Sequence, residues 1–481
     1  MKTSRFFLFM VVIAAMILSA CGSAATSAPA TQAPAATQAP AATQAPAATQ
    51  APGATQAPAA SAQPIGAAPV LSTAPVKLVY WSMWAENEPS AQVIQKLMDA
   101  FTALHPNITF SVVWNGRQNQ TKLRTALAAG TPVDFMDQDT DQVAGGLMSE
   151  GQGLSLDSVL NQPALDKNVA FSDTFAPGIL EQYKSPDGHI YLIPYENNPI
   201  MFMYNKDLFT KAGVTQPPQT WADFLTACEK IKASGVSPLV TESDQNDFNI
   251  YWFTYMIERQ KGPGFLLKTV EDKTGAMWND PVYSNTITLL QDLFTKGYFP
   301  PGVSGYLWPA GQQTIATGTS AAELIGSWLP TELRNTVAPD FKWGELTFPA
   351  IAGGAGKYSD IELWTEAFMI LKKAAHPVEA FEFIKFVMTA ANQTTLATTA
   401  GEGVTNKSVT WIPALAEAQN ASNNATAVIM HADGAEAYHA NFVTNVLNLN
   451  LTPAFFGKMT PQDFSNKMAA AAQTYWKTNN K

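Results

Sequence analysis

The sequence has few of the residues that build reactive or metal-binding sites. Its 481 residues include two cysteines and five histidines. Cys21 stands in the N-terminal segment, so the folded part has no internal disulfide and depends on a large core for stability. Cys228 lies on an apolar helical face with Trp221 and Phe224, which predicts a small buried side chain. Motifs for a serine-hydrolase elbow, a zinc helix or a phosphate-binding loop are missing, so no cofactor is expected.

Positive charge is scarce and scattered. The 29 Lys and Arg residues are outnumbered by 39 Asp and Glu residues. The Lys and Arg residues do not cluster in any run of the sequence or on any predicted helical face. Binding to nucleic acid, or electrostatic binding to a membrane surface, requires concentrated positive charge, so the sequence argues against both. Charged residues make up 14% of the chain and apolar residues 46%, which favours a large globular body.

Long apolar runs are also missing. The apolar run over residues 6–18 is shorter than the ~20 residues that a membrane span needs. Lys2 and Arg5 precede this run and Leu18-Ser-Ala-Cys21 follows it, which predicts a signal peptide over residues 1–20. Leu-Ser-Ala-Cys resembles the bacterial lipobox, and this resemblance implies acylation of Cys21 and anchoring to the outer face of the cell membrane. An ordinary signal peptide with a chance cysteine is the alternative.

Residues 21–76 have the composition of a disordered tether. No residue from 22 to 76 is charged, and Ala, Thr, Gln and Pro dominate. A proline in each repeat opposes helix and sheet, and nothing in the segment is large enough to form a core. Such a tether would keep the following body close to a membrane partner. The six-residue repeat Thr-Gln-Ala-Pro starts at Thr31, Thr37, Thr43, Thr49 and Thr55.

The body, residues 77–481, is too long for one core and fits two lobes. Its first part alternates between the strand period and the helix period. Strands linked by helix-length connections indicate the α/β class with a mostly parallel sheet. Later helices are predicted to start at Thr220, Thr460, Pro281 and Pro377, which match capping or first-turn patterns. The first elements are strands at 77–81, 108–114 and 133–136 and helices at 90–104 and 121–129.

Seven segments of the body resemble the extracellular solute-binding protein family, which includes the sugar-binding proteins of ABC importers. The Tyr-Asn-Lys-Asp-Leu-Phe segment followed by Pro-Pro-Gln-Thr-Trp is the most specific pair. The resemblance implies a type II periplasmic-binding-protein-like fold, in which two α/β lobes close on a ligand about crossing strands. It also implies a monomer that passes a small carbohydrate to the transmembrane subunits of an ABC permease. The segments are 78–84, 122–130, 188–194, 204–213, 217–221, 326–328 and 380–386.

The resemblance also predicts where the lobes and crossings lie. Lobe 1 is expected at about 77–192 plus 329–380, and lobe 2 at about 193–328 plus 381–481. The chain is expected to cross between lobes around 192–198, to return around 328–364, and to cross again near 380–401. Residues that contact the ligand should concentrate at these crossings.

A sugar offers an apolar ring face edged by hydroxyl groups, so its site combines flat aromatic side chains with carboxylates and amides. Trp84 and Glu86 follow the first predicted strand, where open parallel sheets place ligands. Trp328 follows a glycine that would let the backbone approach a ligand. The other candidates are Asp139 and Asp141 after the third strand, Tyr195, Glu196, Asn197 and Asn198 at the first crossing, Trp252 in lobe 2, and Glu362 and Trp364 at the return crossing.

Three alternatives stay open at this point. A secreted glycoside hydrolase would need two catalytic carboxylates, and acidic residues are plentiful enough to supply a pair anywhere. A metal-binding relative would need clustered ligands, but His431 and His439 lack ligand spacing and are expected on a surface helix. The same fold could instead bind a peptide or a polyamine.

Overall fold

The computed structural model describes residues 70–176 and 178–479, which belong to one compact unit. The predicted signal peptide, Cys21 and most of the predicted tether lie outside the described residues. The last tether residues are part of the folded body, since the Ser72 backbone N–H donates to Glu379 and the Asn107 amide donates to the Ser72 carbonyl. The described body therefore includes residues before the expected start at 77. None of its helices combines the length and the apolar character needed to cross a membrane.

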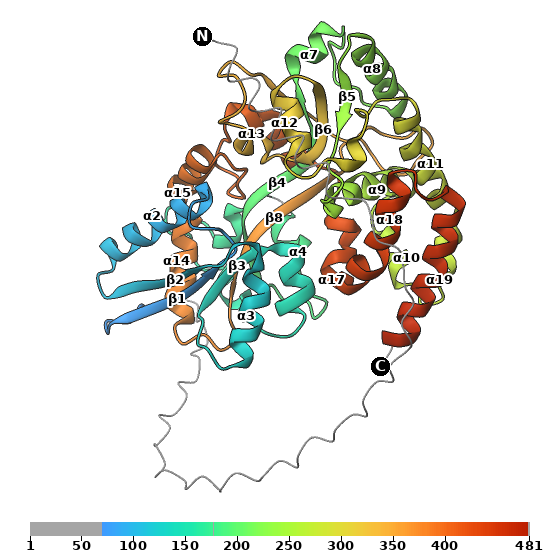
Figure 1. The fold of residues 1–481 in the computed structure, drawn as a ribbon. Coiled ribbons are helices and arrows are strands. Elements are labelled where there is room, and N and C mark those ends of the chain that lie inside the picture. The colour runs from blue at the N-terminus through green and yellow to red at the C-terminus, as the bar shows by residue number, and fades with distance from the viewer. Residues whose placement is uncertain (1–69, 177, 480–481) are drawn as a thin grey trace, which may run out of the picture. The chain divides into compact units, whose positions relative to one another are not determined.

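The described strands form one mixed sheet in the order β2-β1-β3-β8-β4-β6-β5, with β7 beside β4 and β9 beside β8 (Figure 1). The pairs β1–β2, β1–β3, β5–β6 and β8–β9 are parallel, whereas β4 and β8 run antiparallel to their other neighbours. The α/β class is confirmed, but the expectation of a mostly parallel sheet is wrong. The strands are β1 (Val76–Ser82), β2 (Ile108–Trp114), β3 (Phe135–Asp139), β4 (Leu192–Asn205), β5 (Ser237–Val240), β6 (Ser320–Gly326), β7 (Trp343–Leu346), β8 (Ile361–Ile370) and β9 (Val428–Ile429).

Two long strands connect the halves of this sheet. β4 pairs with β8 from Leu192 to Pro199, and from Ile200 onward it pairs with β6 and β7. β8 pairs with β9 at its start and with β3 from Glu366 onward. We call the part around β1, β2 and β3 lobe 1 and the part around β5, β6 and β7 lobe 2. β4 and β8 are therefore shared by the two lobes.

The helices of lobe 1 include α2 (Pro89–Leu104), α3 (Asn119–Ala128) and α14 (Pro377–Val387). The Phe383 ring of α14 contacts the rings of Phe101 on α2 and Phe135 on β3, at centroid distances of 5.5 and 5.8 Å. All of α14 therefore belongs to lobe 1, and the expected lobe boundary at 380–381 falls inside this helix. The chain next meets the crossing strands at Val404, which forms a β-bridge with Glu196.

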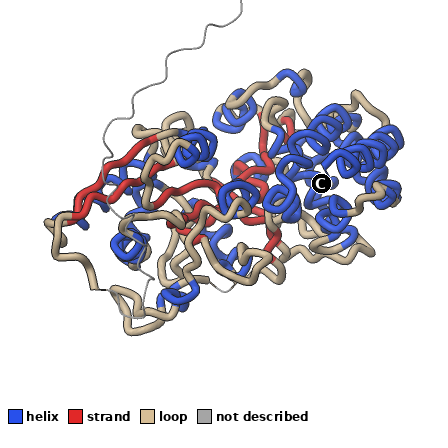
Figure 2. The backbone as a smooth tube through the Cα atoms, turned by 90° about the horizontal axis from the view of Figure 1, so that it is seen from below, coloured by secondary structure: helices blue, strands red, loops and turns tan. Residues whose placement is uncertain are grey.

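Lobe 2 carries most of the remaining helices, which gather around the C-terminal end of the described chain (Figure 2). The expected caps are present, because the side chains of Thr220 and Thr460 accept hydrogen bonds from the backbone N–H groups of Asp223 and Asp463. Cys228 is buried as predicted. The main helices are α8 (Trp221–Ala233), α9 (Asn246–Lys261), α11 (Pro281–Thr295), α16 (Ala416–Asn423), α17 (Ala435–Phe442), α18 (Asn448–Phe455) and α19 (Pro461–Asn479).

Shorter helices fill the connections between these elements. The turn η8 (His431–Gly434) follows β9 and leads into α17. The short helices are α4 (Thr140–Val143), α5 (Asp157–Leu160), α6 (Ile179–Gln182), α7 (Lys206–Lys211), α10 (Phe265–Glu271), α12 (Ala310–Ala316), α13 (Leu329–Glu332) and α15 (Ala390–Thr395).

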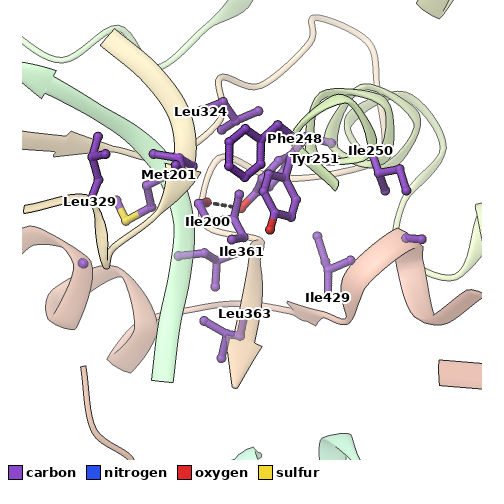
Figure 3. Packing of buried hydrophobic residues seen from close by; sticks show 14 of the residues in the cluster. Ile200, Met201, Phe248, Ile250, Tyr251, Leu324, Leu329, Ile361, Leu363 and Ile429 are labelled. Atoms are coloured by element: carbon purple, nitrogen blue, oxygen red, sulfur yellow. Dashed lines mark hydrogen bonds between the residues drawn. The ribbon is translucent and has the colours of Figure 1, made fainter. Parts of the chain in front are cut away.

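Helix α9 anchors the crossing strands to lobe 2. Every residue of α9 from Phe248 to Arg259 is buried. Its Tyr251 lies in one apolar cluster with Ile200 of β4 and with Ile361 and Leu363 of β8 (Figure 3). The Tyr255 hydroxyl of the same helix donates to the Ile200 carbonyl and accepts from the Glu362 backbone N–H, at 2.7 and 2.8 Å. This packing fixes the start of β8, which carries the site described next.

Candidate functional site

One face of β8 carries alternating acidic and aromatic side chains. Successive residues of a strand point to opposite faces, so Glu362, Trp364 and Glu366 share one face. Residues paired across strands also share a face, and Glu366 pairs with Asp139 of β3 on one side and with Glu196 of β4 on the other. Three carboxylates thus stand side by side across three strands, and we call Asp139, Glu366 and Glu196 the acidic row.

The acidic row is buried and incompletely hydrogen-bonded. Asp139, Glu366 and Glu196 are 3%, 5% and 0% exposed. Asp139 accepts from the Gln142 backbone N–H and so caps α4, and Glu196 accepts from the Ser90 hydroxyl at 2.8 Å. One oxygen of Glu366 and one of Glu196 are buried without a hydrogen-bond partner among the described residues. Such oxygens are costly to bury unless a ligand or water supplies a donor.

Burial raises the pKa values of all three row members, and neighbouring carboxylates add to the rise for Glu366 and Glu196. Burial raises the pKa of Asp139 to about 7. Burial also raises the pKa of Glu366, with Asp139 adding to the rise and the Arg117 guanidinium opposing it. For Glu196, burial and then the nearby Glu402 and Glu366 carboxylates raise the pKa. Each additional negative charge in the row is therefore unfavourable without a cation.

Trp84 lies at one end of the row, where lobe 1 contributes a polar network. The Trp84 indole N–H donates to the Tyr195 hydroxyl, which donates to Asp137, and both distances are 2.7 Å. The Arg117 guanidinium lies 4.8 Å from the centroid of the Trp84 ring and pairs with Glu88. The network fixes the orientation of the indole, which is 8% exposed.

His431, Glu362 and Trp364 form the other end of the site. The Trp364 ring lies 5.0 Å from the His431 ring and 6.2 Å from the Trp328 ring, between centroids. His431 Nδ1 lies 2.8 Å from Glu362, and its backbone N–H donates to Asp141 at 3.3 Å. His431 thereby links α4 of lobe 1 to β8.

His431 is buried in the turn η8, so the expectation of a surface helix is wrong for it. The turn contains two residues with positive φ, Ala432 at 51° and Asp433 at 56°. The Asp433 carboxylate accepts from the backbone N–H groups of Gly264 and Leu266, which holds the turn against α10. A non-glycine pair in this conformation is strained and is retained only where surrounding contacts hold it.

The predicted residues do not all reach this site. Glu86 is exposed and stands apart from the row, whereas Glu88 contacts Arg117. Asn197 pairs with Thr365 and therefore lies on the opposite face of the sheet, where its amide donates to Ser422. Asn198 pairs with Trp364 on the face of the row.

Trp252 is the clearest correction. It is 0% exposed, and its ring packs against the Phe202 and Phe348 rings at centroid distances of 5.1 and 5.8 Å. An indole enclosed by other aromatic rings stabilises the core of lobe 2 and has no free face for a ligand. The resemblance to the family placed Trp252 among the candidates, but the residue lies on α9 among other buried aromatic residues.

Four residues of the site were not among the predicted candidates: Glu366, Asp137, Arg117 and His431. Glu366 could have been found, because it continues the two-residue alternation of Glu362 and Trp364. Asp137 and Arg117 reach the site through pairing and contacts that join distant parts of the chain, so no local pattern marks them. Among the described residues, no three acidic, histidine or cysteine side chains are placed to hold a metal ion.

Gly326 has a role different from the one predicted. A Cβ atom at this position would overlap the Trp328 indole, which folds back over the glycine.

We expect Gly326→Ala to displace the indole, to change the near-UV circular dichroism of the Trp328–Trp364 pair, and to destabilise the fold by roughly 1–3 kcal/mol. Gly305→Ala is the matched control, because a Cβ there meets open space. Equal spectra for Gly326→Ala and the unsubstituted protein would contradict this role.

The site is lined by acidic and aromatic side chains and lies on strands shared by two α/β lobes. This arrangement is that of a solute-binding protein. Residues 85–394 match the family model described as bacterial extracellular solute-binding protein. The chain belongs to this family. Its members are binding proteins, so the protein is not an enzyme and the glycoside hydrolase alternative is set aside.

Relatives and solved structures agree with this assignment. A binding protein of Brucella abortus (strain 2308) is 26% identical over 302 residues, which is 61% of this chain and 67% of the relative. The sn-glycerol-3-phosphate-binding periplasmic protein UgpB of Rhizobium meliloti (strain 1021) is 44% identical over only 66 residues, which is 13% of this chain and 15% of the relative.

Two solved structures show the shared fold. A structure from a study of xylan utilization by Caldanaerobius polysaccharolyticus has a TM-score of 0.69 at 19% identity, covering 82% of this chain and 99% of its own. A chitin oligosaccharide binding protein has a TM-score of 0.67 at 23% identity, covering 83% of this chain and 98% of its own. Identities this low establish the fold and leave the ligand to the chemistry of the site.

Proposed function

We propose that this protein captures a sugar or oligosaccharide between its lobes and delivers it to the transmembrane subunits of an ABC importer. The observation that carries the proposal is the alternation of Glu362, Trp364 and Glu366 on one face of a crossing strand. Trp364 and Trp328 supply ring faces, and the carboxylates accept hydrogen bonds from hydroxyl groups. The similarity to a chitin oligosaccharide binding protein supports the same ligand class.

Ligand entry requires the lobes to separate, because the acidic row is buried in this structure. β4 and β8 are the strands shared by the two halves of the sheet, so the proposed hinge lies where β4 changes partners between Pro199 and Ile200. Closure would remove water from the carboxylates and strengthen their hydrogen bonds to the ligand. A phosphate-bearing ligand fits poorly beside three carboxylates, which disfavours glycerol phosphate.

The proposal is tested with residues 22–481, which leave out the predicted signal peptide and Cys21. We expect titration with an oligosaccharide panel to identify a ligand that changes tryptophan fluorescence, and Trp328→Ala to weaken its binding by more than ~1 kcal/mol, about fivefold. Trp343→Ala is the control, because this half-buried tryptophan packs on Phe341 at the start of β7. Absence of any saccharide that raises the unfolding temperature would overturn the proposal, since a bound ligand stabilises the folded state.

We further propose that Cys21 carries the lipid anchor and that the segment before the body tethers it to the membrane. Several acyl chains give durable anchoring, whereas one would be marginal. We expect Cys21→Ala to leave the protein in the soluble fraction or unprocessed, as measured by membrane fractionation and the mass of the mature N-terminus. Retention in the membrane with a normal mature mass would contradict the anchor.

A further inference from the structure

When its carboxyl groups are ionised, the acidic row has more negative charge than the described residues around it compensate. Like charges placed directly opposite one another on a sheet are destabilising, and Glu366 faces a carboxylate on each side. The described residues contain no ion pair between a Lys or Arg and any member of the row. Glu402, itself buried, adds a further acidic group beside Glu196.

The two nearest cationic groups are already engaged. Arg117 pairs with Glu88 at 2.7 Å, and more than half of its side chain is exposed. The His431 ring lies 2.8 Å from Glu362 and 3.5 Å from Asp247, so its charge is shared by two carboxylates outside the row. Neither group donates a hydrogen bond to the row, so ionisation of the row requires a cation from elsewhere.

Unpartnered oxygens indicate what the row lacks. Glu366 and Glu196 are at least nine-tenths buried, they are paired across the strands, and each has an oxygen without a hydrogen-bond donor. An ammonium group supplies three donors and one positive charge, whereas a hydroxyl group supplies one donor and no charge. Trp364, on the same face of β8, offers an aromatic surface that attracts a cation as well as a sugar ring.

From these observations we propose that the physiological ligand is a sugar or oligosaccharide bearing at least one amino group, whose ammonium is bound by the Asp139–Glu366–Glu196 row. This inference rests on the proposed carbohydrate function and names the chemical class of its ligand. The ammonium would lie between the carboxylates, and the sugar ring would lie against Trp364 and Trp328. An N-acetylated or unsubstituted sugar of the same shape would leave the charge of the row uncompensated.

Three trisaccharides with one β-1,4 backbone test the inference: cellotriose, tri-N-acetylchitotriose and the trimer of glucosamine. They differ at the second ring carbon, which carries a hydroxyl, a neutral acetamide or an ammonium group. In calorimetric titrations of residues 22–481 we expect the glucosamine trimer to bind at least about tenfold more tightly than either neutral trimer, because hydrogen bonds to charged groups are stronger. We also expect its affinity alone to fall when the salt concentration rises from about 0.05 to about 0.5 M.

The variant Glu366→Gln keeps the shape of the side chain and removes one charge, so it should lower the affinity for the glucosamine trimer far more than the affinity for the neutral trimers, and most of the preference for the amino sugar should be lost. Glu345→Gln is the matched control, since Glu345 is a buried carboxylate on β7 that accepts from the Ala418 backbone N–H. Retention of the preference in Glu366→Gln would overturn the assignment of the row.

The remaining outcomes separate this inference from the proposed function. Binding of a neutral trimer as tightly as the glucosamine trimer would overturn the inference and leave the carbohydrate function standing. Binding of spermidine without any of the three trimers would support a cation site and overturn the amino-sugar inference. Failure of all four compounds to bind to a folded protein would overturn the ligand class proposed here.

Discussion

Replacing Arg259 with Met is expected to lower the free energy of unfolding by roughly 3–5 kcal/mol, because the change breaks a buried charged network. Arg259 lies on α9 and is 0% exposed. Its guanidinium pairs with Glu258, donates twice to the Phe348 carbonyl at 3.1 and 3.0 Å, and donates to the Asp360 carbonyl at 2.8 Å. These contacts hold both ends of the segment that leads into β8, so the loss should spread to the crossing strand.

Urea unfolding followed by far-UV circular dichroism measures this effect. Lys261→Met on the same helix is the control, because the ion pair of Lys261 with Asp280 is partly exposed and should contribute less than ~1 kcal/mol. Adding Glu258→Gln to Arg259→Met should recover part of the loss, since it removes the buried carboxylate left unpaired. A loss for Arg259→Met no larger than that for Lys261→Met would show that the network does not hold the segment.

Local signals in the sequence predicted the elements of the fold well. The Thr220 and Thr460 caps and the prolines at the first positions of α11 and α14 are confirmed, because a cap depends on residues within one helical turn. The first strand and helix also agree with β1 and α2 to within a residue. The spacing of apolar residues along the sequence is enough to predict where such elements lie.

The arrangement of the site could be predicted only in part. Trp84, Asp139, Glu196 and Trp364 were expected near a ligand, and the structure joins them through the sheet. The acidic row itself depends on the register of β8 against β3 and β4, in which the paired residues are more than 160 positions apart in the sequence. Register between distant strands is set by the packing of the whole fold, so no local pattern reveals that Glu366 faces two carboxylates.

Burial explains why aromatic candidates were harder to judge than acidic ones. Trp252 and Trp328 both stand beside other aromatic or small residues in the sequence, yet one packs in the core of lobe 2 and the other reaches Trp364. Large apolar side chains occur both in cores and in ligand sites, so the residue type alone does not decide between them. A buried carboxylate requires compensation and is therefore more informative.

The ligand-free protein is expected to lose stability as the pH rises from about 5 to about 8. Burial raises the pKa of Asp139, Glu332 and Glu436 to about 7 and that of Glu402 to about 8. Above pH ~4 the unfolded chain has released protons that these folded carboxyl groups still hold, so raising the pH favours unfolding until the folded groups also ionise.

His431 should act in the same direction. Burial lowers its pKa, but Asp247 and Glu362 raise it more, so the net pKa lies well above the ordinary value. A histidine with a raised folded-state pKa stabilises the protein below its unfolded pKa of about 6.5, and this contribution is lost as the pH rises through the folded pKa. Carboxylates with lowered pKa values, such as Asp157 and Asp280, make the protein more stable as the pH rises. This gain is reached below pH ~4, outside the window from 5 to 8.

Chemical unfolding at pH steps between 5 and 8 should therefore show a loss of at least about 2 kcal/mol across the window, since one pKa unit corresponds to about 1.4 kcal/mol. The double variant Asp139→Asn, Glu366→Gln removes two row carboxylates and should reduce the slope of the profile by their share. Glu345 lies outside the row, and burial raises its pKa to about 8. The variant Glu345→Gln should therefore remove only the contribution of this one group to the slope. A stability that stays constant or rises with pH in the unsubstituted protein would mean that the row carboxyl groups are ionised in the folded state, and that the surrounding residues compensate their charge without a ligand.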